Sequence, residues 1–254
     1  MNTFKLNLLD LPVDILGLIL KSLVTSSTPI QLCPCTPSPI NPLPILLSHP
    51  ALHAIATPLL YAGNGFLLDA TGPHAQHIRR ELQDAPSGSD ERIPGRATLL
   101  TTPGALRRIA RIELRIDRLR GWLGSDIVPL LTELAVHGRM DYLTIWVRTP
   151  AEPRTPCFHP GKQEKDMHMF SRPPLEGLLR VLADPYLVSA QLWVDAQHPK
   201  TWCRFHAGGC GAESGGPGPG REQERRVEIE WREIIRLVDP ERKEITVIGT
   251  EKKW

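Results

Sequence analysis

The sequence has no aspartate, glutamate, lysine or arginine between Lys21 and Asp69. Because the surface of a soluble protein normally carries charge, we expect this segment to be buried or covered by another molecule. The chain also lacks the ~18 consecutive apolar residues that a membrane span needs. Asp10, Pro12 and Asp14 interrupt what would have to be the apolar core of a signal peptide. These absences predict an intracellular protein, in the cytoplasm or nucleus, without a membrane partner.

Neither the charge nor the cysteine content indicates a specialised class of protein. The formal net charge is +2, which is too small for the basic stripe that nucleic-acid binding needs. Arginines crowd residues 79–120, but interleaved acids offset many of them, so a solvated face is expected there. Five cysteines, an odd number, do not make a disulfide framework in a chain of 254 residues. We therefore expect reduced cysteines and no nucleic-acid partner.

Residues 12–24 are predicted to form a helix. Pro12 suits the first turn, where its missing N–H costs nothing, and Asp14 favours the positive end of the helix dipole. The apolar residues of this segment exceed the single stripe of an amphipathic helix, at Val13, Ile15, Leu16, Leu18, Ile19, Leu20, Leu23 and Val24. The pattern favours a helix with one face inward and another against a partner. A wholly internal helix of a large core is the alternative.

Prolines divide the remainder of the N-terminal region. Residues 28–44 contain six prolines, a density that cannot continue a helix or join the interior of a sheet. An extended loop is expected there, with disorder as the alternative. Residues 45–61 predict a second helical region, broken by Pro50 and Pro58. Residues 69–104 are predicted to be an irregular connector, with a possible helix near residues 74–83.

Residues 105–254 are predicted to form a β/α domain. Apolar residues alternate with polar ones around Leu114, Ile145 and Leu192, as in strands with one buried face, and apolar stripes of helical spacing separate them. Leu114 and Ile145 lie 31 residues apart, and subtracting irregular insertions brings the later intervals close to this period. A stacked repeat with parallel strands is therefore predicted, with an ordinary small α/β sandwich as the alternative.

The C-terminal part of this domain leaves a choice open. A glycine-rich stretch makes residues 198–221 a flexible insert by composition. Beyond it, apolar residues at helical spacing run from Val227 to Val238, although Val227, Ile229 and Trp231 also alternate as in a strand. Ile245 and Val247 predict a last strand.

The N-terminal pattern resembles the F-box of fungal F-box proteins. That family opens with Leu-Pro, an acid and a pair of aliphatic residues, and it often ends with Ile-Ala-x-Pro-Leu-Leu-Tyr. The first half is matched by Leu11, Pro12, Asp14, Ile15, Leu16, Ile19 and Leu23. The second half is matched by Leu52, Ile55, Ala56, Pro58, Leu59, Leu60 and Tyr61. The match covers about 55 of the 254 residues.

The resemblance implies a fold, a partner and a docking site. The expected fold class is α+β, with an F-box-like helical module at residues 5–68 followed by a leucine-rich-like β/α repeat with irregular insertions. The implied partner is the Skp-type adaptor of a cullin ubiquitin ligase, and the rest of the chain would present an unknown protein substrate. Adaptor docking is assigned to Leu11, Pro12, Ile15, Leu16, Ile19 and Leu23. The proline-rich insert stands where the family has a middle helix, so part of the adaptor-facing surface would be missing or remodelled.

Metal and catalytic motifs were weighed individually, and neither a catalytic site, a metal site nor a cofactor is predicted. Structural zinc needs four ligands, usually in close pairs. Cys203, His206 and Cys210 supply only three ligands, with Cys157 and His159 as distant additions. Cys33-Pro34-Cys35 lacks a second cysteine pair, and His74-x2-His77 has no carboxylate nearby in sequence. No nucleophile, base and oxyanion donor assemble in any recognised motif.

Three aromatic residues define a possible substrate-facing patch. Trp146 and Trp193 alternate with the inward aliphatic residues of their strands, so both should face the opposite side of the sheet. With Tyr142 they would form an aromatic patch on the open face, since aromatic residues dominate interface hot spots. Cover by flanking loops is the alternative. The sequence thus predicts a non-enzymatic adaptor, with a stand-alone scaffold and an enzyme with a dispersed site as the competing readings.

Overall fold

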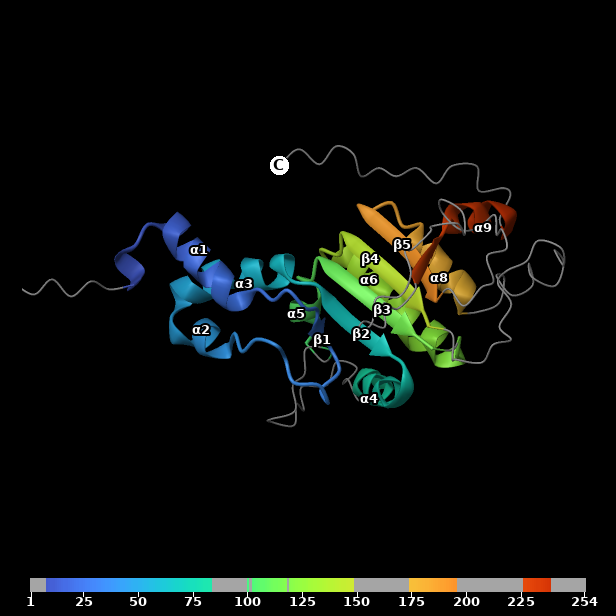
Figure 1. Ribbon diagram of the computed structural model, residues 1–254, viewed down its shortest axis with the longest axis horizontal. Helices are drawn as coiled ribbons and strands as arrows, with labels where there is room; N and C mark the ends of the chain where they lie inside the picture. Colours follow the sequence, from blue (N-terminus) through green and yellow to red (C-terminus); the bar gives the residue numbers. More distant parts are fainter. Residues whose placement is uncertain are drawn as a thin grey trace, which may run out of the picture.

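The computed structural model describes residues 8–83, 100, 102–117, 119–148, 174–195 and 226–238, which form a single sheet with helices on one face and at one end (Figure 1). The strands are β1 Ile30–Gln31, β2 Phe66–Ala70, β3 Arg111–Ile116, β4 Tyr142–Val147, β5 Ser189–Asp195 and β6 Arg226–Ile229. Each strand lies beside its neighbour in sequence (Figure 1). β1 to β5 pair in parallel and β6 pairs antiparallel with β5. The prediction of a mixed fold with parallel strands is confirmed.

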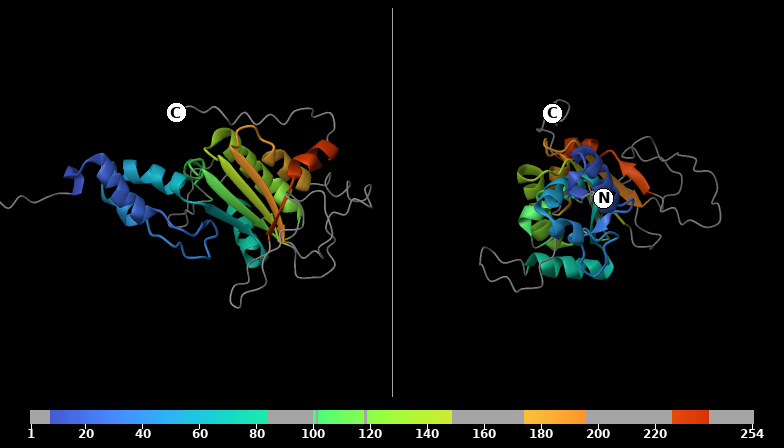
Figure 2. Two further views of the ribbon diagram at one scale, coloured as in Figure 1. Left: turned by 45° about the horizontal axis from the view of Figure 1, so that its top comes forward. Right: turned by 90° about the vertical axis from the view of Figure 1, so that its left-hand side faces the viewer.

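The helices are α1 Val13–Val24, α2 Leu43–Ser48, α3 Pro50–Gly63, α4 Gly72–Gln83, α5 Pro103–Leu106, α6 Val128–His137, α8 Leu175–Leu182 and α9 Trp231–Val238. Of the helices, α4, α6 and α8 follow strands β2, β3 and β4 in sequence and contribute side chains to the core on one face of the sheet. A short 3-10 helix, η1 Leu8–Asp10, precedes α1, and a π-helical turn, η2 Leu123–Ile127, leads into α6. α6 and α8 lie together on one side of the sheet (Figures 1 and 2). Crossovers between parallel neighbouring strands are nearly always right-handed, which places successive helices on the same face.

Strand register sets the core of the sheet. Leu68 pairs with Leu114, Leu114 with Ile145 and Ile145 with Leu192, so four apolar side chains lie at one level across four strands. All four are buried, and they belong to the same core as Ile78, Leu131, Leu134, Leu178 and Leu182 from the covering helices. The predicted alternation in β3, β4 and β5 is therefore confirmed, because one face of each strand packs on helices.

The segment at residues 226–238 begins as a strand, which is one of the two alternatives that the sequence leaves open, and continues as a helix. Residues up to Ile229 form β6, and α9 begins at Trp231, whose indole N–H donates a hydrogen bond to the carbonyl of Ala190 at 3.0 Å. β6 is antiparallel, so it ends the series of parallel strands. The predicted insert at residues 198–221 and the strand at Ile245 and Val247 lie outside the described residues.

The predicted irregular connector at residues 69–104 is wrong in its first part. β2 crosses the proposed domain boundary at residue 68, and α4 occupies Gly72–Gln83, which confirms the possible helix. All five residues of β2 are buried. A strand buried on both faces shows no alternation, so the period-2 signal that marks the other strands is missing here.

The proline-rich insert is largely an extended loop, as predicted, but it also contributes a strand. Ile30 donates its N–H to the carbonyl of Gly65 at 2.8 Å, and Leu32 donates to that of Leu67 at 2.9 Å. The insert thereby supplies β1, an edge strand of two residues beside β2. Prolines are tolerated beside an edge strand, because the chain is hydrogen-bonded there on one side only.

α1, α2 and α3 form a helical unit that projects from one end of the sheet (Figures 1 and 2). α1 and α2 both pack on α3. The fully buried side chain of Asn64 fastens the ends of α1 and α3. Its amide donates to the carbonyls of Val24 and Leu60, both at 2.8 Å, and its oxygen accepts from the N–H of Ser26 at 2.7 Å. Among the described residues, no helix is long and apolar enough to span a membrane.

Candidate functional site

The helical unit leaves one face of α1 exposed. Leu16, Leu20 and Val24, spaced four residues apart, are at most 3% exposed and belong to the same core as Leu52, Ala56 and Leu60 of α3. The remaining large apolar side chains of α1 stay accessible, with exposed fractions of 66% for Val13, 46% for Ile15, 66% for Leu18, 37% for Ile19 and 52% for Leu23. We call these five residues the α1 apolar surface. α1 therefore has one inward stripe and one uncovered stripe, and the alternative of a wholly internal helix is excluded.

α2 adds further apolar exposure to the helical unit. Leu43 is 60% exposed and Leu47 is 81% exposed. Asp14 and Lys21 are the charged residues of α1, and α2 has none. A soluble monomer rarely exposes contiguous apolar area without a binding function, so α1 is a candidate docking surface.

The six predicted docking residues divide between surface and core. Pro12, Ile15, Ile19 and Leu23 are exposed, and Leu11 is half-buried. Leu16 is only 3% exposed, so its assignment to the partner contact is corrected: it holds α1 on α3. Leu18, which the prediction omitted, is more exposed than Ile15, Ile19 and Leu23. Two adjacent apolar stripes look alike in sequence, and only the packing of α3 distinguishes them.

The predicted aromatic patch is only partly accessible. Trp146 pairs with Trp193 in register, so both indoles share the sheet face opposite to α6 and α8. Trp146 is fully buried, with the guanidinium groups of Arg115 and Arg148 at 5.0 and 5.2 Å from its ring centroid. Trp193 is half-buried, and Tyr142 is 38% exposed. Trp146 is therefore a structural residue in this conformation, which corrects its assignment to an open surface.

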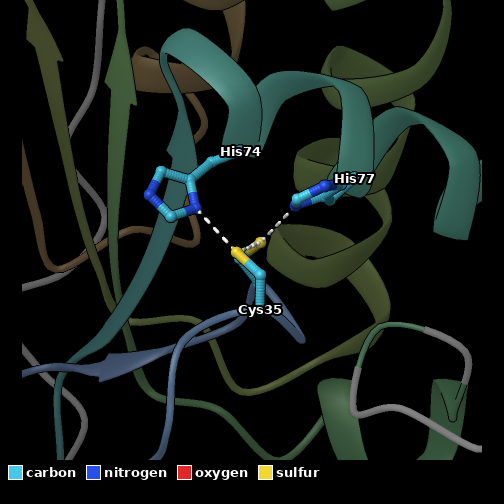
Figure 3. A group of neighbouring side chains, drawn as sticks. Cys35, His74 and His77 are labelled. Carbon is cyan, nitrogen blue, oxygen red and sulfur yellow. Dashed lines mark hydrogen bonds between the residues drawn. The ribbon is translucent and has the colours of Figure 1, made fainter.

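Cys33 and Cys35 of the proline-rich insert meet His74 and His77 of α4; Figure 3 shows Cys35 with the two histidines. The sulfur of Cys35 lies 2.8 Å from the sulfur of Cys33 and 3.0 Å from Nδ1 of His74. The sulfur of Cys33 lies 3.7 Å from Nδ1 of His77. The four candidate ligand atoms all lie within 4.8 Å of one another. We call these four residues the cysteine–histidine cluster.

Two local structures build this cluster. A turn follows β1, in which Pro34 occupies the second position and the N–H of Thr36 donates to the carbonyl of Cys33 at 3.3 Å. Proline is favoured at that position of a turn because its fixed φ matches the required geometry. His74 and His77 lie in the first turns of α4, and their spacing of three residues places both imidazoles on one helix face.

The start of α4 is itself held by short polar contacts. Asp69, at the end of β2, accepts hydrogen bonds from the N–H and hydroxyl of Thr71 at 3.0 and 2.6 Å. Gly72 has φ of +48°, a left-handed conformation that favours glycine, and its N–H donates to Asp117 at 3.3 Å. The chain thus turns sharply from β2 into α4 and brings both histidines over the insert.

Burial controls the protonation of one thiol and one phenol. Desolvation, assisted by the hydrogen bond to Cys35, raises the pKa of Cys33 to about 11, so without a cation this thiol is neutral at pH 7. Desolvation also raises the pKa of Tyr61. A neutral thiol is a poor nucleophile, so Cys33 is not prepared for nucleophilic chemistry.

The comparisons with known proteins add no family name. No family model matches the chain, and neither a curated protein nor a solved structure matches it.

Sequence reasoning considered the two halves of the cysteine–histidine cluster but not together. Cys33 with Cys35 lacks two ligands, and so does His74 with His77, yet each pair supplies what the other lacks. A metal site could have been predicted from the presence, within one chain, of two closely spaced ligand pairs that each lack two ligands. The other candidate ligands, Cys157, His159, Cys203, His206 and Cys210, lie outside the described residues.

Proposed function

We propose that this chain is a recruiting adaptor whose α1 apolar surface docks on the Skp-type adaptor of a cullin ubiquitin ligase. The observation that carries the proposal is the division of α1 into two stripes. Leu16, Leu20 and Val24 belong to the core that α1 shares with α3, whereas Ile15, Leu18, Ile19 and Leu23 lie outside that core and are exposed.

The exposed residues are numerous enough for their burial to matter. Covering one exposed leucine or isoleucine side chain contributes on the order of 1–3 kcal/mol, depending on how much of it becomes buried. Association costs at least about 4 kcal/mol in lost translational and rotational freedom and in side-chain ordering. Burial of the five residues of the α1 apolar surface exceeds that lower bound, whereas burial of one of them would not.

The choice of partner rests on the resemblance to F-box proteins. The matching residues Leu52, Ala56 and Leu60 belong to the same core as the inward stripe of α1, so the two matching halves of the sequence pack against each other. In that arrangement Leu11, Pro12, Ile15, Ile19 and Leu23 remain for the partner. The parallel β/α series after the helical unit would act as a leucine-rich-like domain that presents a protein substrate through the face carrying Tyr142 and Trp193.

A pull-down with the full chain tests the docking proposal. Purified chain is mixed with immobilised Skp-type adaptor, and the retained fraction is compared with that of the double variant Leu18→Asp with Ile19→Asp. We expect retention of the unsubstituted chain and at least about a tenfold loss in the variant, because two charges would be desolvated at the contact. Both substituted residues lie outside the inward stripe, so the far-ultraviolet circular dichroism should not change.

A matched control separates docking from general surface effects. Val188→Asp introduces the same charge at an exposed apolar position next to β5, far from α1 in sequence, where Val188 is 42% exposed. This variant should be retained like the unsubstituted chain. Equal retention of the double variant and the control would refute docking through α1.

One observation favours a second candidate, a scaffold without a ligase connection. The segment that would supply the middle helix of the F-box instead forms β1 and the turn at Pro34, so it is committed to the edge of the sheet. A different partner could then use the α1 apolar surface. Absence of retention on the Skp-type adaptor, with an intact circular dichroism spectrum, would favour the scaffold.

A further inference from the structure

We propose that Cys33, Cys35, His74 and His77 bind one Zn²⁺ ion, which ties the proline-rich insert to α4. The ion would take two sulfur and two nitrogen ligands in a closed tetrahedral site, with no open position for substrate. This site is independent of the docking proposal, because none of its four residues belongs to the α1 apolar surface.

The distances within the cluster suit a tetrahedral ion. Zinc–sulfur bonds of ~2.3 Å and zinc–nitrogen bonds of ~2.0 Å place the ligand atoms of such a site roughly 3.3–3.8 Å apart. The separation of Cys33 from His77 is 3.7 Å and that of Cys35 from His74 is 3.0 Å. The two sulfurs, at 2.8 Å, must move apart by about 1 Å to reach the spacing of a zinc site, and Cys35 and His74 must separate by roughly 0.5 Å. Cys35 is exposed on a turn, so a small rotation of its side chain can open both distances.

The donor set selects the metal class. Two thiolates with two imidazoles in a tetrahedral arrangement are the ligands of structural zinc, whereas magnesium and calcium prefer oxygen ligands. Cys33 is buried while Cys35 is exposed and both histidines are half-buried, so one side of the site is enclosed and the other admits an ion. Both histidines present Nδ1 to the cluster, which leaves Nε2 free to carry the proton of the neutral ring.

The charge of the site also fits its surroundings. Two thiolates and two neutral imidazoles cancel the double positive charge of Zn²⁺, so the occupied site is neutral. The insert itself has no charged side chain, and the carboxylate of Asp69, which acts on Cys33, is already hydrogen-bonded to Thr71. A carboxylate ligand is therefore unnecessary, and its absence from the sequence near His74 does not argue against this site.

Such an ion would stabilise the weakest part of the sheet. β1 has only two residues, and the prolines around it cannot donate backbone hydrogen bonds. A bond network from residues 33 and 35 to residues 74 and 77 would hold the insert against β2 and α4. Because ligands are rarely arranged in the unfolded chain, the free energy of zinc binding adds to the free energy of folding.

Metal analysis of the full-length chain is the direct test. Chain purified with reductant and without chelator should contain one zinc per molecule. After chelation, added Co²⁺ should give the visible d–d absorption of tetrahedral cobalt and a near-ultraviolet sulfur-to-metal band. The variants Cys35→Ser and His74→Ala should weaken metal binding by more than the roughly 10–100-fold that loss of an outer-shell contact costs.

The second cysteine–histidine set provides the matched control. Cys203→Ser with His206→Ala removes the same two ligand types from the other candidate site in the sequence, and this variant should keep one zinc. If zinc is lost from this variant and kept in Cys35→Ser, the proposal is overturned in favour of the distal set.

A measurement on the unsubstituted chain guards against variants that fail to fold. Alkylation mapped by peptide mass spectrometry should leave Cys33 and Cys35 protected in the zinc-loaded chain and reactive after chelation. Equal labelling with and without zinc would overturn the proposal. So would a disulfide between Cys33 and Cys35 in chain that is purified without reductant and contains no zinc.

Discussion

The helical unit and the sheet differ in how far their apolar side chains are exposed. On β3, β4 and β5, the central residues Leu114, Ile145 and Leu192 are at most 4% exposed, because helices cover that face. Thirteen large hydrophobic side chains are exposed in the described residues, and eight of them lie in η1, α1 and α2. The difference shows that the helix-covered face of the sheet is buried in the described residues, whereas the helical unit ends in a surface that another molecule could cover.

The largest expected effect separates the two stripes of α1. Leu20→Asp places a carboxylate in the core between α1 and α3, where Leu20 is 2% exposed, and should destabilise the unit by about 4 kcal/mol or more. Leu18→Asp, at 66% exposure, should change the free energy of unfolding by less than about 1 kcal/mol. Urea unfolding followed by circular dichroism measures both. Similar losses in the two variants would contradict the division of α1 into an inward and an uncovered stripe.

The second prediction concerns the hydrogen bonds of Asn64, which we call the polar lock of the helical unit. Asn64→Ala leaves the carbonyls of Val24 and Leu60 and the N–H of Ser26 without this partner in a buried place. The expected loss is about 2–3 kcal/mol, and limited proteolysis should cut the unit faster while the sheet stays resistant. Asn41→Ala, at an exposed position, is the matched control and should be close to neutral. Equal effects at the two positions would show that the lock contributes little.

The third prediction tests how much the contact between α9 and β5 stabilises the sheet. Trp231→Phe removes the hydrogen bond to the carbonyl of Ala190 and should cost about 1–2 kcal/mol. Trp193→Phe removes similar indole area at a half-buried position and should cost less. Thermal unfolding measures the order of the two variants, and the reverse order would mean that α9 contributes little to the sheet.

The smallest effect is expected on the outer surface of the sheet domain. Arg180 lies one helical turn after Glu176 in α8, with 2.7 Å between Nη2 and Oε1, but its side chain is 65% exposed. Arg180→Ala should lower the free energy of unfolding by only about 0.3–0.5 kcal/mol, and less at high salt. A loss above about 1 kcal/mol in chemical unfolding would show that the sheet domain depends on surface charge as well as on its core.

The sequence predicted those parts of the fold in which one physical pattern acts alone. Alternation revealed β3, β4 and β5, because each of these strands buries one face. β2 was not predicted because both of its faces are buried, so its residues do not alternate between apolar and polar. β1 was not predicted because a strand of two residues is too short to show alternation. The excess of apolar residues on α1 was evident, but the role of Leu16 was not, since both stripes consist of the same residue types.

The cysteine–histidine cluster shows a different limit of sequence reasoning. Its two halves lie about 40 residues apart, and they meet because the insert forms β1 beside β2 and α4 follows β2 directly. The spacing within the cysteine pair and within the histidine pair can be seen in the sequence. The distance between the two pairs depends on the pairing of β1 with β2, which the proline content of the insert argued against. Trp146 was placed on the correct face of the sheet, but the enclosure of its ring depends on neighbouring side chains.

β1 changes how the helical unit and the sheet can move. The chain leaves α1, contributes β1 to the edge of the sheet, returns to form α2 and α3, and enters the sheet again as β2. Three passages of the backbone therefore cross the same junction, where two domains in tandem would share a single hinge. A partner bound to α1 would therefore also fix the orientation of the sheet. A molecule bound to the sheet would then lie at a defined distance and angle from that partner.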